Sequence, residues 1–182
     1  MRRKFILGAM AGAGLAGTAL YFAPRQPDVM YGETQMDAVV RMLKLAEATD
    51  KDIIYDLGCG DGRFVITAAQ QFGARGVGID IDAALVRGAR ESARRSGITD
   101  RVRFIEADLF TADISEATIV TLYLGPQVNL KLRPKLLKEL KPGTRILSYR
   151  FDMGDWRPEK AEQIGSTPIY LWRVPKQNST GV

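Results

Sequence analysis

The chain has 182 residues, of which 46% are hydrophobic and 26% charged, and it carries a formal net charge of +5. This length suits one globular domain with a hydrophobic core. The chain contains no histidine and a single cysteine, Cys59. These counts exclude a Ser-His-Asp triad, a Cys-His pair, the common histidine-based metal sites and an internal disulfide, so we expect no metal.

The first 27 residues differ from the rest of the chain. Basic residues at positions 2–4 precede residues 5–23, nineteen positions without a charge. This segment suits a membrane anchor or the core of a signal peptide, and we favour the anchor because no small-x-small cleavage site ends it. Residues 1–30 hold a net charge of +3, which leaves +2 of the total +5 for the remainder. A nucleic-acid partner is therefore not indicated.

The domain begins with a predicted amphipathic helix that runs to about Ala48. Residues 34–37, Thr-Gln-Met-Asp, resemble a capping box at its start. A short β-branched strand follows at residues 53–55, and after a turn we expect a second helix over residues 63–71. We interpret this strand as the first strand of a parallel sheet and this helix as its first crossover connection.

The turn between them, residues 56–62, reads Asp-Leu-Gly-Cys-Gly-Asp-Gly. Alternate glycines at Gly58, Gly60 and Gly62 predict a tight turn that a ligand can approach closely, because a Cβ would block it. The pattern is not the dinucleotide fingerprint G-x-G-x-x-G, since Arg63 stands where the third glycine is needed. We interpret Cys59 as a small spacer in this turn.

Acidic residues close the next two predicted strands. Residues 76–79 lead to Asp80, whose carboxylate can accept both hydroxyls of a ribose, and Ile81 beside it belongs to the same candidate site. Asp82 is the expected N-cap of a helix over residues 83–96. The third strand, residues 102–105, leads to Asp108, Leu109 and Phe110 as further candidate site residues.

The second half of the domain continues the alternation of strands and helices. Residues 118–124 are a predicted strand, residues 132–140 a helix with Pro134 in its first turn, and residues 145–151 a fifth strand. The strand-like residues 169–172 suggest a final antiparallel hairpin. We therefore expect one α/β domain over residues 28–175, a doubly wound and mostly parallel sheet, with a loose polar tail at 176–182.

The glycine turn and the three acids at successive strand ends resemble motif I and its surroundings in the class I S-adenosylmethionine (SAM) methyltransferases, which have a Rossmann-like fold. The resemblance implies SAM as the cofactor. It places Asp56 near the methionine ammonium, Asp80 at the ribose and Asp108 at the adenine amino group. Leu109 and Phe110 would then flank the adenine ring.

Three further segments resemble a particular branch, the mitochondrial lysine methyltransferases of the ATP synthase c-subunit and the adenine nucleotide translocator, with their bacterial relatives. These segments are residues 31–34, 122–126 and 149–158. The resemblance covers about residues 28–175 and implies a protein-lysine N-methyltransferase that acts on a membrane-associated protein. Met30 and Glu33 depart from it, because the family usually has prolines there.

By position, the resemblance implies an acceptor pocket shaped by Tyr31, Thr34, Tyr123, Pro126 and Trp156. The rings of Tyr31 and Trp156 could face a lysine ammonium, with packing of the hairpin as the alternative for Trp156. Asp152 or a chain of waters could accept the proton that lysine must lose.

Two other functions stay open at this point: methylation of a small membrane-soluble acceptor such as a quinone or lipid, and SAM binding without turnover. We expect association with a membrane through the N-terminal segment and a catalytic domain that faces the cytoplasm, with export as the alternative.

Overall fold

The computed structural model of the protein describes residues 34–176. The N-terminal hydrophobic segment, Tyr31 and most of the predicted tail lie outside the described residues. Within residues 34–176, no helix has the length and apolar character needed to cross a membrane.

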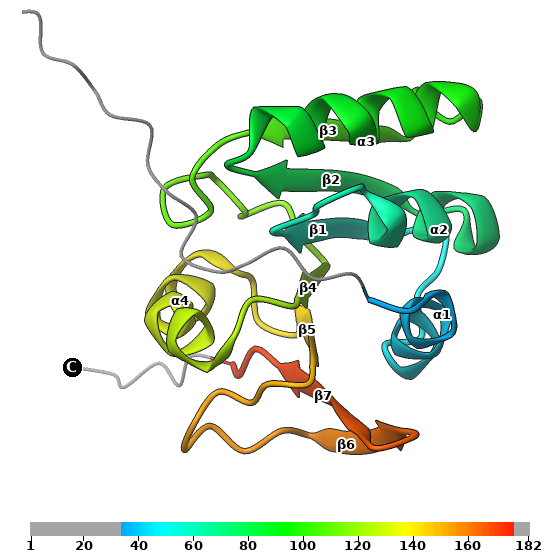
Figure 1. Cartoon of the computed structure of the whole chain (residues 1–182). Coiled ribbons are helices and arrows are strands. Elements are labelled where there is room, and N and C mark those ends of the chain that lie inside the picture. Colours follow the sequence, from blue (N-terminus) through cyan, green and yellow to red (C-terminus); the bar gives the residue numbers. More distant parts are fainter. Residues whose placement is uncertain (1–33, 177–182) are drawn as a thin grey trace, which may run out of the picture.

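The described residues form four helices and seven strands. In chain order these are α1 (Met36–Leu45), β1 (Ile53–Leu57), α2 (Arg63–Phe72), β2 (Arg75–Asp80), α3 (Ala83–Arg95), β3 (Val102–Glu106), β4 (Ile119–Leu122), α4 (Pro126–Glu139), β5 (Arg145–Tyr149), β6 (Lys160–Ile164) and β7 (Thr167–Arg173). The strands make one sheet in the order β3-β2-β1-β4-β5-β7-β6 (Figure 1).

The first five strands pair in parallel, and β7 pairs antiparallel with both β5 and β6. The sheet therefore confirms the predicted doubly wound, Rossmann-like α/β fold with a C-terminal antiparallel hairpin. The carboxyl ends of β1, β2, β3, β4 and β5 lie along one edge of this sheet, which is where open α/β folds bind their ligands.

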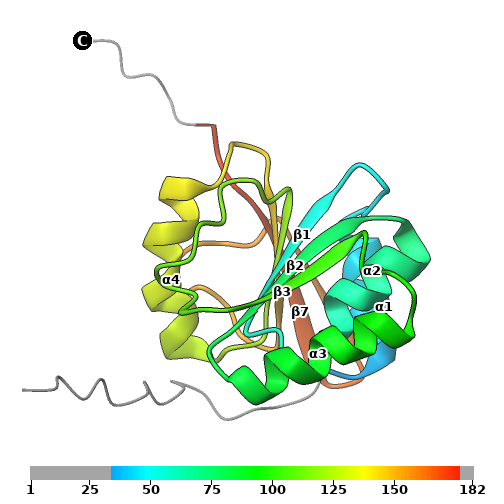
Figure 2. The same cartoon turned by 90° about the horizontal axis from the view of Figure 1, so that it is seen from above.

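The helices cover the two faces of the sheet unequally. Figure 2 shows α1, α2 and α3 on one face and α4 on the other. Side chains of the central strands alternate between these faces: Ile146 belongs to the core beneath α4 and Leu147 to the core beneath α1. Both faces are buried, so the strands are apolar runs, as is usual for parallel sheets. A loop without a helix joins β3 to β4.

Helix α4 begins earlier than the sequence predicted. Gly125 precedes it with a φ of 108°, and Pro126 occupies its first turn. Proline is favoured there because its fixed φ suits the first helical position and its missing N–H has no partner to lose. Pro134 consequently lies inside the helix, where the prediction of a first-turn position was wrong. It removes one hydrogen bond, the one to the carbonyl of Leu130, a residue that is 41% exposed.

The predicted capping box at α1 is absent. Gln35 is the N-cap residue and its side chain makes no capping hydrogen bond. Thr34 is buried instead, and Asp37 accepts the N–H of the next residue, Ala38. The first turn of α1 is therefore held by packing and by Asp37.

Charged side chains lie against both edges of the sheet. On the β3 edge, Arg90 of α3 donates two hydrogen bonds to the carbonyl oxygen of Phe104, at 3.1 and 2.7 Å. On the β6 edge, Arg41 of α1 forms an ion pair with Glu162. These contacts tie α3 and α1 to the two outermost strands.

Candidate active site

The glycine turn between β1 and α2 adopts the conformation that its glycines predict. Gly58, Gly60 and Gly62 have φ values of 78°, 53° and 82°, a region that other residues rarely adopt. A Cβ on Gly58 would lie 2.5 Å from a methyl carbon of Leu124, and one on Gly62 would lie 2.6 Å from the ring of Phe104. The turn therefore needs glycine for conformation and for space.

Asp80 joins this turn to the next helix. Its carboxylate accepts the N–H of Gly60 at 2.9 Å with one oxygen and the N–H of Asp82 at 3.0 Å with the other. Each carboxylate oxygen has a second lone pair, which a ligand hydroxyl can use. Asp82 caps α3 as predicted, by accepting the N–H groups of Ala84 and Leu85 at 2.7 and 3.3 Å. Ile81, which lies between these two residues in the sequence, is half-buried.

Asp56, the last but one residue of β1, is buried with 5% of its surface exposed. Thr121 of the neighbouring strand β4 donates its hydroxyl to Asp56 Oδ1 at 2.6 Å. Burial raises the pKa of Asp56 to about 7; the negative charges of Asp80 and Asp61 raise it further, and the Thr121 hydrogen bond opposes them. The buried carboxylate thus lies where a positively charged ligand group would stabilise its ionised form.

Sequence reasoning missed Thr121. Its signal was present, because Thr121 is the polar member of an otherwise apolar strand and stands in register with Asp56. Cys59 is also buried, and burial together with Asp56 and Asp80 raises the pKa of its thiol. A neutral, buried thiol is a poor nucleophile, which supports its interpretation as a small spacer.

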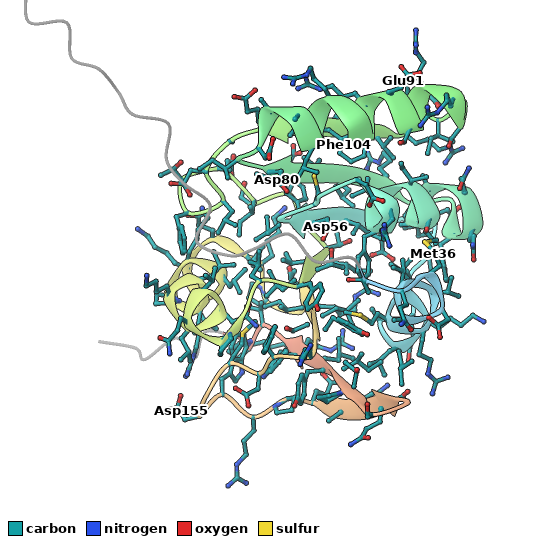
Figure 3. All side chains as sticks on the ribbon, viewed as in Figure 1. Met36, Asp56, Asp80, Glu91, Phe104 and Asp155 are labelled. Carbon is teal, nitrogen blue, oxygen red and sulfur yellow. The ribbon has the colours of Figure 1, made fainter. Side chains whose placement is uncertain are left out.

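The loop after β3 brings the third predicted acid to the same edge. The N–H of Ala107 donates to the carbonyl oxygen of Asp80 at 2.9 Å, and Asp108 Oδ1 accepts the N–H of Phe110 at 2.9 Å. Leu109 and Phe110 are half-buried against the core beneath α4. In Figure 3 Asp56 and Asp80 lie at the ends of neighbouring strands, whereas Asp155 lies far from them.

Arg63 connects the glycine turn to the beginning of α1. Its guanidinium makes a two-pronged ion pair with Asp61, the shortest N–O distance being 2.6 Å, and donates to the carbonyl oxygen of Thr34 at 2.7 Å. Burial opposes ionisation of Asp61, but the hydrogen bonds and charge of Arg63 prevail and lower its pKa. Arg63, which broke the dinucleotide pattern, therefore positions the segment that carries Thr34.

Three aromatic rings meet where β4 and β5 end. The ring of Tyr123 lies 5.0 Å from that of Tyr149 at an interplanar angle of 88°, and 6.1 Å from that of Phe151 at 19°. Tyr149 is part of the core beneath α1, with Tyr123 packed against it, so this cluster is on the α1 face of the sheet. Sequence reasoning named Tyr123 and missed the other two rings.

Trp156 and Asp152 lie elsewhere. The Trp156 ring contacts Trp172 at 6.1 Å and the guanidinium of Arg133 at 5.8 Å, and Trp172 Nε1 donates to the Trp156 carbonyl at 2.7 Å. These are contacts of hairpin packing, the alternative that the sequence left open. Asp152 accepts the N–H of Gly154 at 3.0 Å in an exposed turn. Among the ring contacts of residues 34–176, none joins Trp156 to Tyr123.

The family described as the ANTKMT methyltransferase domain matches residues 56–160, more than half of the chain and all of the site described above except Thr34. The chain belongs to this family. It is therefore a SAM-dependent methyltransferase, as the glycine turn and the three strand-end acids predicted.

Relatives of this methyltransferase agree on the chemistry. A protein-lysine N-methyltransferase of Saccharolobus islandicus is 44% identical over 139 residues, which cover 76% of this chain and 86% of that protein. The ATP synthase c-subunit lysine N-methyltransferase of Mus musculus is 30% identical over 155 residues, or 85% of this chain and 61% of the relative. The chain thus spans less than two thirds of that mouse protein.

A solved structure carries the cofactor product. The crystal structure of an RNA methyltransferase from Salinibacter ruber in complex with S-adenosyl-L-homocysteine is 50% identical to this methyltransferase, with a TM-score of 0.80, and the alignment covers 82% of this chain and 98% of that one. Its acceptor differs in name from those of the lysine methyltransferases, whereas its cofactor chemistry is the same.

The site of this methyltransferase fits SAM. The ammonium of the cofactor would offset the cost of burying Asp56, and the left-handed conformations of Gly58, Gly60 and Gly62 give the turn its tight bend. Asp80 would accept hydrogen bonds from the ribose hydroxyls on its remaining lone pairs, and Asp108 would accept a hydrogen bond from the adenine amino group. These individual roles stay predictions from the family resemblance.

Proposed function

We propose that this methyltransferase transfers the methyl group of SAM to the ε-amino group of lysine in a membrane-associated protein. The observation that carries the proposal is the 44% identity to a protein-lysine N-methyltransferase across 86% of that protein's length. Other relatives are named for the ATP synthase c-subunit and for the adenine nucleotide translocase, and these names support a membrane-associated protein as the acceptor.

The described residues supply binding, positioning and exclusion of water. SAM, when bound, supplies a methyl group activated by the sulfonium. A lysine ammonium has a pKa of about 10.4 in water and must lose its proton first, which apolar surroundings favour. The buried and half-buried rings of Tyr149, Tyr123 and Phe151 provide such surroundings on the α1 face. Because Asp152 lies outside the ring cluster, in an exposed turn, the proton would reach it or bulk solvent through water in this proposal.

The hydrophobic residues 5–23 would tether the enzyme to the membrane that holds its substrate. We propose a catalytic domain that faces the cytoplasm, where SAM is made. A protease added outside intact spheroplasts should leave the domain uncut, and the same protease should digest it in inverted membrane vesicles. Digestion in intact spheroplasts would place the domain on the other side.

The acceptor is tested by incubating the full chain with methyl-labelled SAM and separate membrane-protein, soluble-protein, RNA and lipid fractions. We expect label in a membrane protein, recovered as methyl-lysine after hydrolysis. Asp80→Asn, which removes a carboxylate oxygen from the proposed ribose site, should abolish it. Label in RNA would instead match the acceptor named for the Salinibacter relative, label in lipid a small-molecule acceptor, and SAM binding without transfer a binding protein.

A further inference from the structure

We infer that the outer face of α4 binds the surface of an anionic lipid membrane and turns the carboxyl edge of the sheet, at which the parallel strands end, toward the bilayer. The α4 outer face is the side of this helix that points away from the sheet and comprises Leu130, Lys131, Pro134, Leu137 and Lys138. The inference rests on the proposed membrane-associated acceptor and adds a membrane contact within the folded domain.

An apolar row runs along the α4 outer face. Leu130, Pro134 and Leu137 are spaced by four and three residues, so they share one side of the helix. The side that packs on the sheet is formed by other residues, among them the fully buried Leu132 and Leu136. Leu130 is 41% exposed and is one of three large hydrophobic side chains exposed within residues 34–176, so it is available to a partner. Helix α4 therefore has apolar residues on two sides, and the core uses only one of them.

The charges beside this row are positive. Lys131 and Lys138 are exposed and lie seven residues apart on one flank of the row, and the exposed Lys141 follows the end of the helix. None of the three forms an ion pair within residues 34–176. The acidic residue of α4, Glu139, is paired with Lys135 at 2.6 Å. An apolar row flanked by lysines suits the membrane interface, where apolar side chains enter the acyl boundary and lysines remain among anionic headgroups.

The α4 outer face is continuous with the carboxyl edge. Helix α4 begins at Pro126, shortly after β4 ends, so its first turns lie at this edge, and Figure 2 shows α4 alone on its face of the sheet. A Cβ on Gly154 would lie 2.9 Å from a methyl carbon of Leu130. Arg133 pairs with Asp155 of the same loop. A membrane that contacts Leu130 would therefore lie next to the loop that follows β5.

The proposed N-terminal tether reaches the same edge. Arg63, at the start of α2, donates to the carbonyl oxygen of Thr34 at 2.7 Å, which holds the first described residue beside the glycine turn. Residues 24–33 separate the uncharged stretch from Thr34, and such a segment spans at most roughly 36 Å. A tether of this length gives the α4 outer face an effective concentration near the bilayer in the millimolar range. A contact that is weak by itself is then sufficient to orient the domain.

The test measures whether position 130 enters the membrane interface. The full chain carrying Leu130→Trp is reconstituted in vesicles of phosphatidylcholine, with or without phosphatidylglycerol, and quenching by lipids brominated along the acyl chain is recorded. Subtracting the signal of the wild type, which contains Trp156 and Trp172, isolates the new tryptophan. We expect strong quenching in the anionic vesicles and little in the neutral ones. Gln70→Trp is the matched control, because Gln70 is exposed on α2, across the sheet from α4, and should stay unquenched.

Charge variants in the Leu130→Trp background test the lysines. Each lysine near an anionic surface contributes about fivefold, so replacing Lys131, Lys138 and Lys141 by glutamine should lower the ratio of docked to undocked protein on the order of 100-fold. The control replaces three arginines on α3 by glutamine, which changes the net charge equally and should leave quenching intact; they are Arg87, Arg94 and Arg95. Affinity for S-adenosyl-L-homocysteine within about twofold of wild type shows that each variant is folded.

Equal quenching in neutral and anionic vesicles, equal quenching at positions 70 and 130, or quenching that survives loss of the three lysines would overturn the inference. Absence of quenching in both vesicles would also overturn it, and a raised KM of the lysine variant for the acceptor in native membranes would then assign the face to an acidic protein. The proposed function fails separately. Quenching with label in RNA or lipid would remove the lysine acceptor alone, whereas methyl-lysine without quenching would remove the membrane contact alone.

Discussion

Replacing Asp56 by asparagine should stabilise the cofactor-free protein above neutral pH. Burial raises the pKa of Asp56 from 3.8 to about 7. A folded pKa above the unfolded value means that, as pH rises, the unfolded chain loses this proton first. The resulting penalty on the folded state is absent below pH 4, grows between pH 4 and 7, and is complete above pH 7. Its full size is roughly 4 kcal/mol.

Asparagine keeps an oxygen that can accept the Thr121 hydroxyl, and it carries no charge. Urea unfolding of wild type and Asp56→Asn at several pH values measures the difference in unfolding free energy. We expect a small difference at pH 4 and an advantage for the variant of a few kcal/mol at pH 8. A difference that does not change between pH 4 and pH 8 would refute the reasoning, since a packing effect has no such dependence.

The same group should report cofactor binding. A ligand ammonium beside Asp56 lowers its pKa, so binding of SAM at pH 6 expels a proton; the free protein, with a pKa of about 7, holds about 0.9 of a proton there. Calorimetry in buffers of different ionisation enthalpy counts the protons released. Asp56→Asn should release none at this site and bind SAM more weakly. Equal release by both proteins would show that the ammonium binds elsewhere.

Three further substitutions test the packing around the site. Gly62→Ala should destabilise the protein by about 2–4 kcal/mol in urea unfolding, because φ is 82° and the new Cβ meets the Phe104 ring at 2.6 Å; an unchanged midpoint would contradict this. Gly88 lies on the exposed side of α3, where an added Cβ would meet no atom within 4 Å. Gly88→Ala should therefore stabilise the protein by about 0.5–1 kcal/mol and leave methyl transfer unchanged. Any loss of stability would count against the helical setting of Gly88. Asn129→Asp replaces the donor to the Phe151 and Asp152 carbonyls by an oxygen, so the Tm should fall by several degrees; an unchanged Tm would contradict this role of Asn129.

The cofactor half of the site could be predicted from the sequence because its signals are local. The glycine turn follows its strand directly, and Asp80 ends the next strand along the chain, so turn chemistry and strand periodicity were sufficient to locate them, whereas their roles toward SAM came from the family resemblance. Asp82 as the cap of α3 was predicted in the same way and is confirmed.

The acceptor half could not be predicted to the same extent, because its contacts join strands that are distant in sequence. Tyr123 contacts Tyr149 and Phe151 because β4 and β5 are neighbours in the sheet. The sequence around Tyr149 contains no local pattern that predicts this contact. Trp156 shows the converse: a conspicuous aromatic residue in a family-like segment contacts Trp172 of the hairpin. The start of α4 was missed because Gly125-Pro126 was interpreted as the end of a strand and not also as the beginning of a helix.

The charged contacts at the two outer strands have a consequence for how the protein behaves at high concentration. An open sheet offers unpaired backbone groups on its outermost strands, and another molecule can add a strand there and start aggregation. The guanidinium of Arg90 already occupies the Phe104 carbonyl that such a strand would need. On the other side the Arg41–Glu162 pair places charge against β6. The charge at each border therefore disfavours the addition of a strand.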